Sequence, residues 1–225
     1  AKAADPKSGG RQMPQHYGHK DLRIVSQSSP TGTQFLQAVG CAMVCKMGKT
    51  KEVVYVSAGE GTTSQGDFHE ALNWASNAKA PVIFHIQDNE YAISTHRSEQ
   101  TASSIYDITS GYGNLSRYDV DGTDFFETSL AFKEAVQRAR RSKGPSIIVS
   151  HVVRLLPHSS SDDQRKYRDE KSLNNDLKKD PILILESKCI DAKFIKADEF
   201  AKIRLQVDKD VDCLLYTSPS PRDYG

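Results

Sequence analysis

The sequence predicts an α/β protein with a doubly wound parallel sheet, and three observations support this fold class. Two short apolar runs, 53–58 and 81–86, have the length of buried parallel strands. Two more strand-like segments, 117–120 and 145–153, follow later, so strands and helices alternate. The segment between the first two runs carries apolar residues at helical spacing: Phe68, Ala71, Leu72, Ala75 and Ala78.

The remaining elements follow from punctuation and spacing along the chain. The polar segment 1–20 contains Gly and Pro and is expected to be a loop. A helix is expected over 33–47, ending at Gly48, and the segment 95–113 is polar and irregular. A second long helix is expected over 124–142. Its inner face is predicted to carry Phe126, Leu130, Ala135, Val136 and Ala139.

The C-terminal third begins with a charged, hydroxyl-rich loop over 154–172, directly after the fourth strand. Helices are expected after Pro181 and again around Asp198. We therefore divide the chain into an α/β domain over 1–172, a helical region over 173–212 and a tail over 213–225.

Composition restricts the classes of partner. Thirty basic residues against 29 acidic ones leave a net charge of +1, which indicates neither a nucleic-acid nor a membrane partner. Four cysteines without paired spacing suggest a reducing compartment. Cys41 and Cys45 share one helix face with apolar residues, so we expect them to be core residues rather than metal ligands.

Polar residues follow the two central strands, and Glu60 and Asn89 stand thirty positions apart. Because parallel strands end at the same edge of a sheet, these two side chains are expected to face one another. With the Tyr91 carbonyl they offer the oxygen ligands that magnesium prefers. Gly61 and Thr62 are expected to open a helix that favours a phosphate. The alternative is an ordinary βαβ unit with a solvated Glu and a turn Asn.

The wider pattern resembles a known enzyme family. GEG at 59–61 followed by DN at 88–89 resembles the thiamine diphosphate motif, usually GDG followed about thirty residues later by NN. Five longer motifs stand in the expected order: GRQMPQHYG, SSPTGTQ, GEGTTSQGD, NEYAIST and PHSSSDDQRKYR. Together they resemble the alpha subunit of the decarboxylating component of 2-oxo acid dehydrogenase complexes, of the branched-chain (2-oxoisovalerate) type.

The resemblance implies an activity with partners. It implies thiamine diphosphate-dependent oxidative decarboxylation of a branched-chain 2-oxo acid, with acyl transfer to the lipoyl groups of an acyltransferase component. A beta subunit, separate or fused, would complete a heterotetramer in branched-chain amino acid catabolism, so the chain alone is expected to be inactive. The compartment would be the cytoplasm in a bacterium or the mitochondrial matrix in a eukaryote. The alternatives are a pyruvate dehydrogenase alpha subunit and a non-catalytic nucleotide-binding domain.

The resemblance also implies roles for particular residues. Glu60, Asn89 and the Tyr91 carbonyl would bind magnesium. The cofactor would be held by Ser29, Gly61, Thr62 and His158. Potassium would be bound by Ser28, Pro30, Thr33 and Gln34, although capping of a helix is the commoner use of such residues.

Three further positions are singled out by this resemblance. His158 would act as a catalytic residue and position the bound intermediate, and His16 would line the site. Without the resemblance, the alternative for each is a solvated histidine on a surface loop, and for His16 the residues alone favour that alternative. Ser159 matches a serine that kinases phosphorylate in mitochondrial relatives. Gln87 stands in the cofactor-binding region where branched-chain relatives often place an Arg, so charge pairing is reduced there. The tail from Cys213 to Gly225 resembles a translated sequencing adapter, and the chain is expected to be a fragment.

Overall fold

A computed structural model describes residues 8–9, 11–13 and 16–217 of the chain. The chain divides into two compact units, Thr31–Leu185 and the combination of Ala1–Pro30 with Glu186–Gly225. Three positions of the GRQMPQHYG motif, Gly10, Pro14 and Gln15, lie outside the described residues, as does 218–225. The sequence boundaries at residues 172 and 212 stay predictions.

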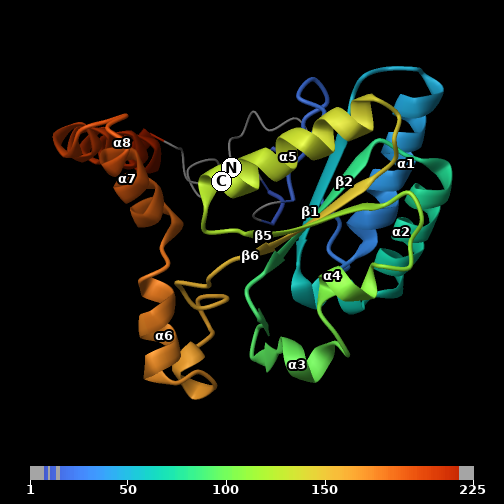
Figure 1. Cartoon of the computed structure of the whole chain (residues 1–225). Helices are drawn as coiled ribbons and strands as arrows, with labels where there is room; N and C mark the ends of the chain where they lie inside the picture. The colour runs from blue at the N-terminus through green and yellow to red at the C-terminus, as the bar shows by residue number, and fades with distance from the viewer. Residues whose placement is uncertain (1–7, 10, 14–15, 218–225) are drawn as a thin grey trace. The chain divides into compact units, whose positions relative to one another are not determined.

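The larger unit is built on a four-stranded parallel sheet, as predicted, and its strand order is β1-β2-β6-β5 (Figure 1). The strands are β1 (Val54–Gly59), β2 (Val82–Asp88), β5 (Ser116–Asp121) and β6 (Ser146–His151). The register pairs Gly59 with Gln87 and Asp88 with His151. The carboxyl ends of all four strands therefore meet at one edge.

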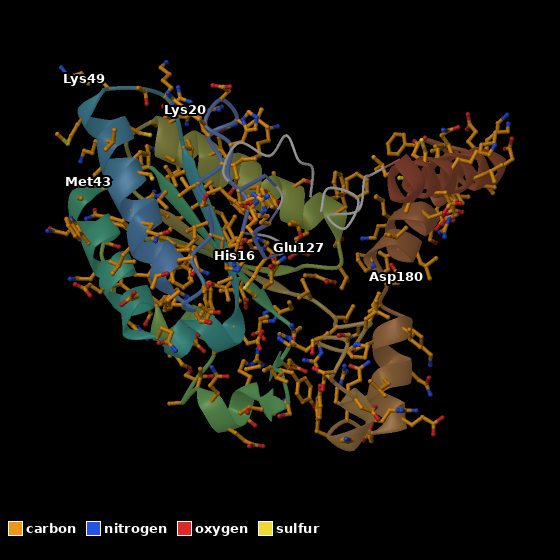
Figure 2. The ribbon with its side chains drawn as sticks, turned by 180° about the vertical axis from the view of Figure 1, so that it is seen from behind. His16, Lys20, Met43, Lys49, Glu127 and Asp180 are labelled. Carbon is orange, nitrogen blue, oxygen red and sulfur yellow. The ribbon has the colours of Figure 1, made fainter. Side chains whose placement is uncertain are left out.

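Helices cover both faces of this sheet, which makes it doubly wound (Figure 1). Helices α1 (Thr33–Met47) and α2 (Gly66–Ala78) pack on one face, and α5 (Phe125–Arg140) packs on the other. On β2, Phe84 joins the first core and Ile83 joins the second, as the period of two along a strand requires. Figure 2 shows Met43, which packs against the first core, on α1 and Lys49 just beyond its end.

The first core is centred on three phenylalanines from α1, α2 and β2. Phe35 lies with its ring centroid 5.1 Å from that of Phe68 and 6.1 Å from that of Phe84, and all three are fully buried. Each such side chain contributes about 1.5–3 kcal/mol through burial. This core fixes α1 and α2 against the strands whose ends carry the candidate site.

The predicted inner face of α5 is partly wrong. Ala135 and Ala139 are buried and Val136 packs against the second core, but Phe126 and Leu130 are 46% and 57% exposed. Ala131 takes the inward position instead, so the buried stripe consists of small residues at a spacing of four. The larger side chains lie outside this stripe because α5 faces the sheet through its alanines.

Short elements occupy the segment predicted to be irregular. Strands β3 (Tyr91–Ala92) and β4 (Thr95–His96) form an antiparallel pair, followed by α3 (Arg97–Gln100) and α4 (Ile105–Ile108). The hairpin of β3 and β4 directly follows β2. It therefore places α3 close to the carboxyl edge of the sheet.

The C-terminal helices agree with the sequence. A 3-10 turn, η2 (Gln164–Lys166), precedes α6 (Glu170–Leu177), α7 (Pro181–Asp191) and α8 (Ala197–Thr217). Helix α8 continues through Cys213, where the tail was predicted to begin. No helix in the described part of the chain is both long and apolar enough to span a membrane.

Candidate functional site

Glu60 and Asn89 lie together at the carboxyl ends of β1 and β2. The Asn89 backbone N–H donates a hydrogen bond of 3.2 Å to Glu60 Oε2. The parallel register of β1 and β2 dictates this proximity, since Glu60 and Asn89 each follow the end of a paired strand. The predicted proximity is therefore observed, and their role as metal ligands stays a prediction.

Glu60 is a buried carboxyl group. Glu60 is only 2% exposed, and this burial raises the pKa of its carboxyl group above the usual value. The nearby Asp88 carboxylate also raises this pKa, whereas backbone hydrogen bonds at Glu60 and Asn89 lower it. A positive charge next to Glu60 would favour its ionised form.

The segment at Gly61 forms a different type of helix from the one that the sequence predicts. Glu60–Ser64 form a short 3-10 helix, η1, and the α-helix begins only at Gly66. Thr63 Oγ1 donates a hydrogen bond of 2.7 Å to the Glu60 carbonyl, so this carbonyl has a partner within the tight turn. The sequence prediction of an α-helix N-terminus at Gly61 and Thr62 is therefore wrong.

Gly61 is required by the close approach of β3. A Cβ atom at this position would lie 2.6 Å from Ala92 Cβ. Gln100 Nε2 donates hydrogen bonds of 2.7 Å to both the Gly61 carbonyl and Ser64 Oγ, so η1 is also held from α3. Only glycine fits between these two contacts without a shift of the backbone.

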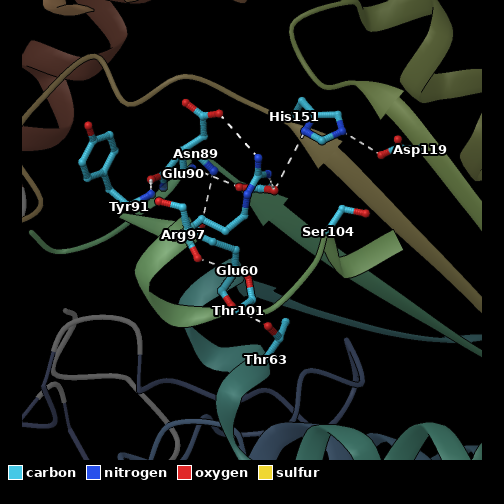
Figure 3. Close-up of polar contacts among 12 residues, drawn as sticks. Glu60, Thr63, Asn89, Glu90, Tyr91, Arg97, Thr101, Ser104, Asp119 and His151 are labelled. Carbon is cyan, nitrogen blue, oxygen red and sulfur yellow. Dashed lines mark hydrogen bonds and ion pairs between the residues drawn. The ribbon is translucent and has the colours of Figure 1, made fainter. Parts of the chain in front are cut away.

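The turn after β2 is held by side-chain caps (Figure 3). Asp88 Oδ1 accepts from the Glu90 N–H at 3.0 Å, and Asn89 Oδ1 accepts from the Tyr91 N–H at 3.1 Å. Asp88 is 1% exposed and forms an ion pair with Arg97. Its Oδ2 also lies 3.9 Å from His151 Nδ1, and His151 Nε2 lies 2.7 Å from Asp119 Oδ1.

The His158 loop is connected to this edge through Tyr91. The Arg154 guanidinium lies 5.5 Å from the centre of the Tyr91 ring and donates to Tyr167 Oη at 2.6 Å. Tyr167 Oη in turn donates to Asp162 Oδ2 at 2.7 Å. Asp162 also accepts from the His158 N–H at 2.9 Å, and the Tyr167 hydroxyl is the main reason that the pKa of Asp162 is lowered.

His158 and Ser159 are themselves exposed on that loop. Ser159 Oγ lies 3.1 Å from Ser161 Oγ, and the phosphorylation of Ser159 stays a prediction. Gln87 is exposed on β2, in register with Gly59, the residue that precedes Glu60. These positions leave the predicted cofactor roles of His158 and Gln87 open.

The predicted potassium ligands fall in both compact units. Thr33 and Gln34 begin α1 in the larger unit, where Gln34 Oε1 accepts from the Gly32 N–H at 3.0 Å. Ser28 and Pro30, like the predicted cofactor residue Ser29, belong to the other unit. There His16 Nδ1 lies 3.1 Å from the Gln27 carbonyl oxygen. The roles of these residues stay predictions.

Sequence reasoning missed several residues of this edge. Arg97, His151 and Arg154 join the network although no motif contains them, and Tyr167 lies within the PHSSSDDQRKYR motif but was given no role. One pattern could have indicated Arg97, which is the sole Lys or Arg between Lys79 and Arg117. Among the described residues, no three His, Cys, Asp or Glu side chains are grouped to hold a metal. A cation at this edge would therefore depend on amide and carbonyl oxygens as well.

Comparison with known proteins gives consistent relatives. The chain is 47% identical over 188 residues to the 2-oxoisovalerate dehydrogenase subunit alpha of Bacillus subtilis (strain 168), covering 83% of this chain and 57% of the relative. It is 43% identical over 166 residues to the mitochondrial 2-oxoisovalerate dehydrogenase subunit alpha of Homo sapiens, covering 73% of this chain and 37% of the relative. The chain therefore spans a little more than half of the first relative's length and less than half of the second's.

A solved structure supports the fold. Transketolase from Campylobacter jejuni subsp. jejuni NCTC 11168 matches with a TM-score of 0.50 and 21% identity, over 55% of this chain and 20% of that one. At this identity the likeness concerns the fold alone. The family described as "Dehydrogenase E1 component" matches residues 1–220. Because that match extends over nearly the whole sequence, the chain belongs to the dehydrogenase E1 component family.

Proposed function

We propose that this chain is part of the alpha subunit of a thiamine diphosphate-dependent 2-oxo acid dehydrogenase that acts on branched-chain substrates. The proposal is supported by the relatives, which are 2-oxoisovalerate dehydrogenase alpha subunits. The observation that carries it is the hydrogen bond that the Asn89 backbone N–H donates to the buried Glu60 carboxylate. A beta subunit would complete the site, and a lipoyl acyltransferase would accept the acyl group.

The oxygen donors at this edge fit magnesium. Glu60 supplies a carboxylate, Asn89 an amide oxygen and Tyr91 a backbone carbonyl, all of them hard ligands. Burial disfavours the charged form of Glu60, and a divalent cation would reverse this effect. Glu60, Asn89 and Tyr91 would therefore hold magnesium, and Gly61 and Thr62 would lie beside the diphosphate. Thiamine diphosphate, when bound, supplies the carbanion stabilisation that decarboxylation needs.

The other residues of the chain would bind and orient. By the family resemblance, Ser29 would contact the cofactor, and Ser28, Pro30, Thr33 and Gln34 would bind a potassium ion that stiffens the cofactor loop. His158, on the loop connected to Tyr91 through Arg154, would position the diphosphate and the bound intermediate. Phosphorylation of Ser159, close in sequence to Asp162, would disturb the same loop by charge repulsion.

Binding is tested by calorimetry on the 225-residue chain. Titration with thiamine diphosphate in the presence of Mg²⁺ is expected to give heat, and NAD is expected to give none. Glu60→Gln should abolish the dependence on Mg²⁺ because it removes the anionic ligand. Glu134→Gln, which changes an exposed glutamate on α5, is the matched control and should bind as the unmodified chain does. Equal binding of NAD would favour a nucleotide-binding domain instead.

Activity is tested in the assembled enzyme. The full-length alpha subunit together with its beta subunit should consume 2-oxoisovalerate in preference to pyruvate when both compete. A preference for pyruvate would assign the chain to the pyruvate type. The 225-residue chain alone should turn over neither substrate, because the resemblance implies that a beta subunit completes the site.

A further inference from the structure

Arg97 holds the turn that follows β2 from three directions. Its guanidinium forms an ion pair with Asp88 Oδ2 and lies 3.6 Å from Glu90 Oε1. Its backbone N–H donates a hydrogen bond of 2.8 Å to the Glu90 carbonyl. Figure 3 shows Arg97 reaching from α3 toward Asn89 and Glu90.

Asp88 is the residue that most needs this partner. It is 1% exposed, and an ionised carboxylate at such a depth is strongly disfavoured without a compensating charge. His151 lies farther away, at 3.9 Å, and its other ring nitrogen is engaged by Asp119 at 2.7 Å. Arg97, whose side chain is 24% exposed, is therefore the main neutralising group for Asp88.

The two residues that Arg97 contacts stand on either side of Asn89. Glu90 has a φ of 69°, a left-handed conformation that is unfavourable for a residue with a side chain. The Glu90 N–H donates a hydrogen bond to the Asp88 side chain, and the Glu90 carbonyl accepts one from the Arg97 backbone N–H. The conformation of Asn89 and Tyr91 thus depends on a turn that Arg97 stabilises.

We propose that Arg97 is a positioning residue for the candidate metal site: by neutralising Asp88 and anchoring Glu90, it holds Asn89 and Tyr91 beside Glu60. This inference rests on the proposed function. The chain carries two acidic residues in this turn and a single Lys or Arg between Lys79 and Arg117, and the fold brings these charges together. Arg97 touches neither metal nor cofactor in this role and acts through Asn89 and Tyr91.

The test measures metal binding and backbone order separately in the 225-residue chain. Mn²⁺, whose free ion is detected by electron paramagnetic resonance, is titrated in the presence of thiamine diphosphate. Arg97→Met should weaken Mn²⁺ binding by about 10–100-fold, as is usual for groups that orient metal ligands. Without metal, the Asn89 and Tyr91 amides should exchange with deuterium about tenfold faster. Arg141→Met, an exposed arginine at the opposite edge of the sheet, is the matched control.

The double variant Asp88→Asn with Arg97→Met decides between charge compensation and simple loss of structure. Because it leaves no buried unpaired charge, it should fold and bind Mn²⁺ within about threefold of the unmodified chain. The proposal is overturned if Arg97→Met alone binds Mn²⁺ equally well or more tightly, or if the double variant fails to recover binding or folding. Should the unmodified chain bind no Mn²⁺, the proposed function fails, and the amide exchange still decides whether Arg97 holds the turn.

Discussion

Gly61→Ala is expected to destabilise the larger unit through a single steric contact. The new Cβ would lie 2.6 Å from Ala92 Cβ, whereas carbon atoms ordinarily approach to about 3.5–4.0 Å, so roughly 1 Å must be gained by movement. Gln100 holds the Gly61 carbonyl and Ser64 at 2.7 Å, which resists that movement. Overpacking of this kind costs about 1–3 kcal/mol. At about 2–4 °C for each kcal/mol, the midpoint of thermal unfolding should fall by about 2–12 °C.

Circular dichroism during heating measures this change, and two variants make the assignment specific. Gly40→Ala places a methyl group on the exposed side of α1, where nothing lies within 4 Å, and should instead stabilise the chain by about 1 kcal/mol through helix propensity. Adding Ala92→Gly to Gly61→Ala removes the atom that clashes and should restore most of the loss. An unfolding midpoint for Gly61→Ala equal to that of the unmodified chain would refute the steric explanation.

Three further predictions concern the core and two buried ionisable groups. Phe84→Ala should lower the free energy of unfolding by about 3–5 kcal/mol in urea titrations, because Phe84 is fully buried between β2 and α1. Burial lowers the pKa of His85 below 6.5, so the unfolded chain binds this proton more readily and stability should fall as the pH decreases below that value. His85→Gln should flatten the pH dependence of the urea midpoint. Because burial raises the pKa of Glu60, the metal-free chain should lose stability as the pH rises above 4.5, and Glu60→Gln should remove this loss while it abolishes Mg²⁺ dependence.

The strands and the proximity of Glu60 to Asn89 could be predicted because both follow from local chemistry. The apolar runs determined β1 and β2, and the parallel register then required Glu60 and Asn89 to lie at one edge. The start of α2 could not be predicted in the same way. Glu60–Ser64 form a separate 3-10 helix before α2, in which Thr63 Oγ1 donates to the Glu60 carbonyl, and helical periodicity does not indicate such an interaction.

Side-chain networks between distant segments were beyond the reach of sequence reasoning. Arg154 is far from Tyr91 in the chain, and their contact depends on how the loop after β6 returns toward β3. The prediction of the buried face of α5 was partly wrong for a related reason. Its periodicity fits either large or small residues facing inward, and only the sheet surface selects Ala131 over Leu130.

The turn after β2, which carries Asp88 and Glu90, shows why departures from a motif should be interpreted together. Asp88 stands where the thiamine diphosphate motif usually has an asparagine, and alone it would place an uncompensated charge beside Glu60. Arg97 supplies that compensation from outside the motif. Glu60 is also longer than the usual aspartate, and its carboxylate accepts a bond from the Asn89 backbone. Glu60 keeps the carboxylate of the usual aspartate, so only Asp88 taken singly argues against a metal site, and the folded chain pairs its charge with Arg97.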